Sequence, residues 1–298
     1  MLSQDAPPSY KGMTDPNSEE HAMFFRQLLG DVDTPTAPFG MLERHGDAIG
    51  MEEAELEVDG ALASRLRVIT RAFAVSAASV CHLAWAQVLA KTSGQEDVVF
   101  GSVLYTRMPG ATGEEGYRLF PTTVPVRICI GEESAENSLK RVQNLLTDLL
   151  RHRHASLGLA QRCSAVPAST PLFSSLFGYR RSQSSQETYR IAAEVPDLEN
   201  RCAHLHTGYP FVLSVDDLGD QLKFVAQAPA SIGALRICHF MHTALASLIE
   251  ALQSAPSTPV SLLNVLPAAE RHQVLFGWND TRIDFPSHKC IQIGRAHV

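Results

Sequence analysis

Residues 76–104 read SAASVCHLAWAQVLAKTSGQEDVVFGSVL, a helical segment followed directly by a strand segment. Ser76 can cap a helix over residues 77–92, and Gly94 can end that helix. Because the helix is apolar on nearly all sides, it belongs inside a protein core. Residues 98–104 follow with several β-branched side chains, which is typical of a strand near the centre of a sheet. This stretch predicts a domain that combines helices with a sheet.

The flanking sequence supplies further strands and helices. Alternating or short apolar runs predict strands over residues 53–58, 123–130, 172–179, 211–215 and 222–227. Asp59 and Ser134 can each cap a helix, and further helices are predicted over residues 21–29 and 233–252. A turn at residues 217–220 makes a hairpin of the last two strands. The fold class is therefore α/β, with an open mixed sheet flanked by helices.

Composition excludes several classes of function. The 298 residues carry a net charge of −7, whereas phosphate binding needs clustered Lys and Arg, so no nucleic-acid partner is predicted. The sequence has no run of about 18 apolar residues and no basic-then-apolar start, so neither a membrane span nor a signal peptide is predicted. A cytoplasmic location is the expectation. The widely spaced cysteines then indicate buried free thiols.

Metal binding is one alternative interpretation. Cys202, His204 and His206 alternate, so a strand would place them on one face. Cys238 and His242 are four residues apart and share one face of a predicted helix. Neither group has the spacing of a dedicated four-ligand site. A metal-binding protein is therefore kept as an alternative, and no metal ligand is assigned.

Other polar clusters are better explained as structure. Asp216, Asp217 and Asp220 lack the loop of an EF-hand calcium site and are interpreted as a solvated hairpin turn. His152 lies among arginines at the end of a predicted helix, where cations complement the helix dipole. No loop ends in Gly-Lys-Ser or Gly-Lys-Thr and no Gly-x-Ser-x-Gly motif occurs, so neither that mode of nucleotide binding nor serine hydrolase chemistry is predicted.

Several segments, taken in order, carry a resemblance to a known family. Residues 95–101 read QEDVVFG, and residues 119–127 read LFPTTVPVR, similar to a Gly-x-Phe-Val-Asn-Thr-x-x-x-Arg segment with Thr122 in place of the Asn. Residues 206–211 read HTGYPF, similar to Arg-x-x-Tyr-Pro-Leu, and residues 278–292 read WNDTRIDFPSHKCIQ. Together they resemble the C-terminal lobe of condensation domains of nonribosomal peptide synthetases, followed by the linker toward an adenylation domain.

The resemblance implies one lobe of a chloramphenicol-acetyltransferase-like two-lobed fold, with a substrate tunnel between the lobes. The residues that it places nearest the tunnel are Thr122, Thr123, His206 and Tyr209. Arg107 and Arg127 are implied to be structural supports that tie strand ends through bidentate hydrogen bonds. The family's catalytic signature, His-His-x-x-x-Asp-Gly, is absent from the sequence. No catalytic residue is therefore assigned, and the chain is expected to be a fragment that is inactive alone.

The resemblance also implies partners. Peptidyl and acyl carrier proteins would deliver thioesters on phosphopantetheine arms, and an amine on one would attack the thioester on the other to form an amide. The chain itself would bind no cofactor. The other implied partners are the missing N-terminal lobe and a downstream adenylation domain. A non-catalytic module that docks a carrier protein is a second alternative. Residues 29–35 also resemble dual condensation–epimerisation types, so the stereochemistry stays open.

These expectations divide the chain into five segments. Their predicted bounds are a mobile lead-in (1–22), an inter-lobe helix and linker (23–50), the condensation lobe (51–266), a linker toward an adenylation domain (267–292) and a sequence artefact (293–298).

Overall fold

The structure, a computed structural model, describes residues 17–42, 50–109, 117–181 and 208–281, with the backbone alone for 105–109 and 117–121. The chain divides into two units, Met1–Val265 and Leu266–Val298. All strands and the long helices lie in the first unit.

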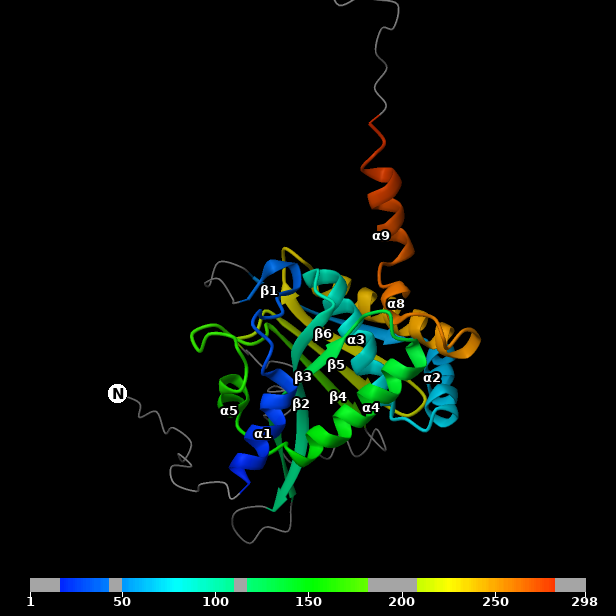
Figure 1. The fold of residues 1–298 in the computed structure, drawn as a ribbon. Coiled ribbons are helices and arrows are strands. Elements are labelled where there is room, and N and C mark those ends of the chain that lie inside the picture. The colour runs from blue at the N-terminus through cyan, green and yellow to red at the C-terminus, as the bar shows by residue number, and fades with distance from the viewer. Residues whose placement is uncertain (1–16, 43–49, 110–116, 182–207, 282–298) are drawn as a thin grey trace, which may run out of the picture. The chain divides into compact units, whose positions relative to one another are not determined.

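Six strands form one mixed sheet in the order β1-β6-β5-β4-β2-β3. β4 is parallel to β2 and to β5, and the other neighbouring pairs are antiparallel. The predicted open mixed sheet is confirmed (Figure 1). The strand bounds are β1 (Met51–Val58), β2 (Asp97–Pro109), β3 (Tyr117–Cys129), β4 (Ser175–Arg181), β5 (Phe211–Asp217) and β6 (Leu222–Pro229).

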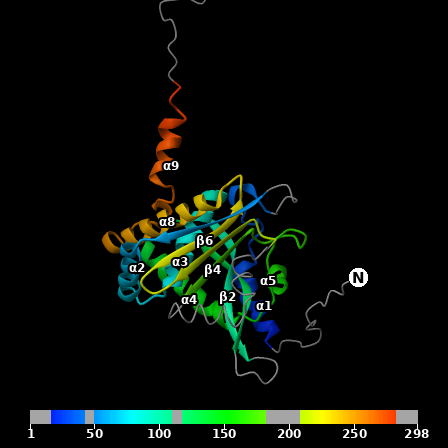
Figure 2. The same ribbon diagram turned by 180° about the vertical axis from the view of Figure 1, so that it is seen from behind.

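Helices cover the two faces of this sheet unequally (Figures 1 and 2). One face packs against α2 (Gly60–Ala72), α3 (Ala77–Ser93), α4 (Ala135–Arg151) and α8 (Ala234–Ser254). The other face meets α1 (Ser18–Leu29) and α5 (Leu157–Arg162), which lie beside β3. The burial of alternate residues in β5 and β6 fits this arrangement, because the side turned to α8 is buried and the other side is half-exposed.

The helix-capping predictions are confirmed. The Asp59 carboxylate accepts a hydrogen bond from the N–H of Leu62 at 2.8 Å, and the Ser76 hydroxyl accepts one from the N–H of Ser79 at 3.1 Å. Gly94 ends α3 in the left-handed conformation, with φ of 72°. The core helix α3 is buried over residues 79–90, as its sequence indicates.

The hairpin of β2 and β3 is longer than the sequence indicated. All 13 residues of β2 pair with β3, whereas β4 pairs with β2 only at Gly101–Val103. The hairpin therefore extends past the sheet as a two-stranded ribbon, visible in Figure 1. The strand prediction over residues 123–130 missed the part of β3 before Thr123, which contains Pro121. An edge strand tolerates proline because one side of its backbone is unpaired.

The segment around Thr36, predicted as a linker before β1, is hydrogen-bonded to the sheet. Thr36 forms a β-bridge with Phe173, and its hydroxyl accepts the N–H of Val99 at 2.8 Å. A 3-10 turn follows at Pro38–Gly40. α1 also begins at Ser18, so residues 18–22, assigned to the lead-in, are helical.

Two further sequence expectations concern the cysteines and the membrane. Cys81, Cys163 and Cys238 are buried free thiols as predicted, but Cys129 is exposed. The prediction is wrong there because Cys129 ends the edge strand β3. Over the described residues, no single helix is long and apolar enough to cross a membrane; α2 and α3 pass that test only as a pair bent by 112°.

The second unit contains α9 (Ala268–His272) and a π-helical turn at Gln273–Gly277. Four of its large apolar side chains are exposed: Val274, Leu275, Phe276 and Trp278.

Candidate functional site

The two threonines assigned to the tunnel lie next to each other on β3. Thr122 is paired with Leu104 of β2, and Thr123 with Val103. Consecutive residues of a strand point to opposite faces, so the two hydroxyls do not share a face. Thr122 has the parity of Val124, whose partner Ser102 contacts α3, and it therefore lies on the helix-covered face. Thr123 lies on the opposite face.

Tyr209 lies two residues before β5, which is separated from β3 by β4 and β2. Its ring stacks on Phe173 with centroids 5.5 Å apart, and burial raises the pKa of its hydroxyl. Thr123 is level with Ser214 across the strands, five positions along the chain from Tyr209. At about 3.3 Å per residue and 4.8 Å per strand, Thr123 and Tyr209 are roughly 20 Å apart. A site lined by both must be elongated.

Of the two arginines assigned as structural supports, only Arg127 has a described side chain. Arg107 pairs with Leu119 in the β2–β3 ribbon, but its side chain lies outside the described part. Arg127 makes bidentate contacts: its Nε donates to both carboxylate oxygens of Asp97 at 3.1 and 2.9 Å, and its guanidinium also pairs with Asp31. A further bond of 2.9 Å reaches the carbonyl of Leu28. Arg127 thus joins β3 to β2 and to the end of α1.

This guanidinium also changes the acidity of its neighbour. The hydrogen bond from Arg127 lowers the pKa of Asp31 to about 2, so the carboxylate stays charged through the neutral and mildly acidic range. The pKa of Arg127 is raised by its bonds to Asp31 and Asp97.

The structure describes only one of the two groups considered for metal binding. Cys202, His204 and His206 lie outside the described residues. The thiol of Cys238 points at the carbonyl of Ala54, 3.7 Å away, and burial raises its pKa to about 12, which disfavours the thiolate that a metal needs. Within the described ranges, no three His, Cys, Asp or Glu side chains gather in a metal-binding arrangement.

The interpretation of Asp217 as part of a solvated turn is wrong. Its carboxylate is fully buried and accepts hydrogen bonds from Arg67 of α2, from the hydroxyl of Tyr179 on β4 and, at 3.0 Å, from the N–H of Gly219. Burial raises the pKa of Tyr179, so the phenol remains a donor. Asp216 instead pairs with Arg180 at 2.7 Å on the opposite face. No local pattern indicated the partner, because Arg67 is 150 residues away.

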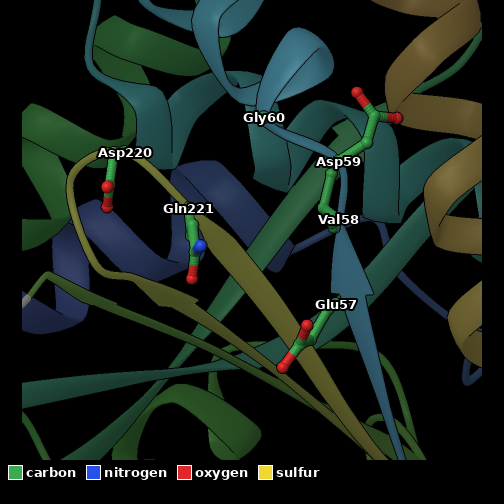
Figure 3. A pocket seen from close by; sticks show the side chains of 6 residues that line it. All are labelled: Glu57, Val58, Asp59, Gly60, Asp220 and Gln221. Carbon is green, nitrogen blue, oxygen red and sulfur yellow. The ribbon is translucent and has the colours of Figure 1, made fainter.

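A shallow depression of about 480 Å³ lies where β1 enters α2 beside the β5–β6 turn (Figure 3). It is lined by Glu57, Val58, Asp59, Gly60, Asp220 and Gln221. Figure 3 shows that the three carboxylates point in different directions, and that of Asp59 already caps α2. None of the assigned tunnel residues lines this depression.

Comparison with known proteins identifies relatives over nearly the whole chain. The sequence profile of the family described as "Condensation domain" matches residues 17–275. Malpinin synthetase from Mortierella alpina is 43% identical over 274 residues, which is 92% of this chain and 4% of that protein. Malpibaldin synthetase from the same organism is 41% identical over 274 residues, covering 92% of this chain and 5% of that protein. The chain therefore spans a small part of these relatives.

Solved structures share the fold. The first condensation domain of the CDA synthetase superposes with a TM-score of 0.58 at 14% identity, covering 85% of this chain and 54% of that chain. A four-domain nonribosomal peptide synthetase bound to AMP and glycine superposes with a TM-score of 0.61 at 12% identity, covering 87% of this chain and 21% of that chain.

Proposed function

Because this chain belongs to the condensation-domain family of nonribosomal peptide synthetases, we propose that it is one lobe of an amide-forming domain. In this proposal an amine on one carrier protein attacks the thioester carbonyl on another, the C–N bond forms, and the thiol of the phosphopantetheine arm leaves. The lobe's contribution is orientation of the two arms, which replaces a bimolecular encounter. The His-His-x-x-x-Asp-Gly signature would come from a second lobe.

The extent of the shared fold supports a second lobe. Most of this chain, 85%, aligns with 54% of a solved condensation-domain chain, so almost half of that chain has no counterpart here. The β2–β3 ribbon that extends past the sheet gives further support. A two-stranded ribbon is marginally stable by itself, and a neighbouring lobe would stabilise it.

The unequal cover of the sheet supports a choice between the two threonines. Thr122 and Thr123 are both half-exposed, but the face of β3 on which Thr122 lies is the one that packs against α3 and α4. Thr123 is on the face that α1 and α5 cover only beside β3. We assign Thr123 to the tunnel wall, with Tyr209 toward the other end and His206 as a further member. We assign Arg127, and Arg107 by analogy, to holding the strands together rather than to substrate contact.

The remaining proposed partners are carrier proteins and a downstream adenylation domain, in the cytoplasm. The exposed apolar side chains of the second unit support a following domain, because Val274, Leu275, Phe276 and Trp278 would lose solvent contact against it. Phosphopantetheine would be part of the carriers, not of this chain.

The test is amide formation with loaded carriers. The chain is joined to the N-terminal lobe of a relative that carries His-His-x-x-x-Asp-Gly, and the carrier-bound product is measured by mass spectrometry. The joined polypeptide is expected to form the amide, and the 298-residue chain alone is not. Amide formation by the chain alone would contradict the proposal. Carrier binding without product in the joined polypeptide would favour the non-catalytic docking module.

Thr122 and Thr123 form a matched pair of variants for the tunnel assignment. In the joined polypeptide, Thr123→Val is expected to lower the rate about tenfold, which corresponds to one lost hydrogen bond of about 1.4 kcal/mol. Thr122→Val has the same change in shape and is expected to leave the rate within about twofold, since it contacts no substrate. The reverse order would place the tunnel on the other face.

A further inference from the structure

Two buried histidines join α1 to the end of α4. Nδ1 of His21 lies 2.7 Å from Nδ1 of His152, and the rings meet edge to face with centroids 5.0 Å apart. His21 is 4% and His152 7% exposed. The ring of Phe24 stacks on His152 with centroids 4.1 Å apart. The contact spans 131 residues of sequence and fixes α1 to the lobe.

The distance between the two nitrogens limits how many protons the pair can hold. In the neutral pair, one Nδ1 donates and the other accepts. One added proton is tolerated, because an imidazolium N–H can donate to a neutral imidazole. A second proton would set two N–H donors and two positive charges against each other at 2.7 Å, and the contact could not persist.

The groups around His152 do not remove this limit. Burial lowers the pKa of His152, and the neighbouring His21 lowers it further. Glu20 on α1 and Asp148 on α4 favour the imidazolium, whereas Arg151 on α4 opposes it. His152 lies at the end of α4 as expected, but its ring is turned inward, and burial disfavours its charged form.

We propose that the His21–His152 contact makes the docking of α1 sensitive to protons. While the pair holds at most one added proton, α1 stays packed through its buried side chains Phe25 and Leu29. When α1 opens locally, each imidazole is free to take a proton at its ordinary pKa near 6.5, so acid favours the open form.

Hydrogen exchange of the 298-residue chain tests the proposal. Amide exchange of residues 22–29 is measured from pH 7.5 to 5, corrected for intrinsic rates, with the core of α3 as the internal reference. The open form takes up one more proton than the closed form, so the opening constant of α1 is expected to rise about tenfold per pH unit below about 6.5. α3 is expected to stay more protected than α1 throughout.

Two variants test whether His152 causes the pH dependence of α1 opening. His152→Asn keeps a hydrogen-bonding group near His21 but cannot take a proton, so the opening constant of α1 should become nearly independent of pH. His154→Asn removes an exposed histidine two residues away and should keep the wild-type slope. The same slope in His152→Asn as in the wild type, a flat wild-type profile, or equal loss of protection in α1 and α3 would each overturn the proposal.

Discussion

Nε2 of His82 lies 2.9 Å from the hydroxyl oxygen of Ser102, which joins the core helix α3 to the central strand β2. Nδ1 of the same ring lies 2.7 Å from the carbonyl oxygen of Ala78. Nδ1 therefore donates a hydrogen bond to that carbonyl, and Nε2 accepts one from the serine hydroxyl. His82 is 3% and Ser102 1% exposed. A serine–histidine pair shut off from solvent cannot reach a substrate, and its role is structural.

This contact predicts acid sensitivity of the fold. Burial lowers the pKa of His82 from 6.5 to about 4. Because the folded-state pKa lies below the unfolded value, the stabilisation is complete above pH 6.5 and is lost as the pH falls toward 4. The free energy of unfolding, measured with urea, is expected to fall by about 3 kcal/mol over that window.

The double variant His82→Leu with Ser102→Ala separates this effect from other titrations. It removes the titrating ring without leaving the serine hydroxyl unpaired in the core. The decline between pH 6.5 and 4 should become shallower by about the amount assigned to His82. An unchanged decline would show that other groups cause it.

The buried carboxylate of Asp217 predicts a large mutational effect. Asp217→Ala leaves Arg67 and the hydroxyl of Tyr179 without their acceptor, so the free energy of unfolding should fall by about 2–4 kcal/mol. Asp220→Ala removes an exposed carboxylate from the same turn and should change it by less than about 0.5 kcal/mol. Equal effects in urea denaturation would disprove the network's contribution.

The tight packing around Gly101 predicts that a single added methyl group lowers stability. A Cβ at this position would lie 2.5 Å from Cδ2 of Leu176 and 2.7 Å from Cε2 of Phe173. Gly101→Ala should therefore lower the free energy of unfolding by about 1–3 kcal/mol through overpacking. At Gly60 a Cβ would meet nothing within 4 Å, so Gly60→Ala, measured in the same thermal or urea experiment, should leave stability unchanged or slightly raised.

Ala74 predicts a stabilising substitution. Its φ is 51°, and the next N–H, that of Val75, bonds back to the carbonyl of Thr70 at 3.1 Å, as in a helix end that prefers glycine. Ala74→Gly relieves the left-handed strain and should raise the free energy of unfolding by about 0.5–1 kcal/mol. Ala72→Gly, at the last residue of α2, relieves no such strain and should lower it slightly. If both variants destabilise, the strain at Ala74 is absent.

The helices and strands of this protein are specified by local sequence. Ser76, Asp59 and Gly94 mark the ends of helices because a capping side chain or a left-handed glycine acts within a few residues. The apolar run of α3 and the β-branched run of β2 predicted the core, because such side chains are recognised from the local sequence alone. The succession of short motifs between residues 95 and 292 also predicted the family correctly.

Which polar groups meet depends on the packing of distant elements. Asp217 was assigned to solvent because Arg67 and Tyr179 are distant in sequence. The contact of His152 with His21 was not predicted because the two residues are 131 positions apart. The faces of Thr122 and Thr123, and their distance from Tyr209, follow from strand order and register. Short-range preferences specify helices and strands, but pairing across more than a hundred residues depends on how those elements pack.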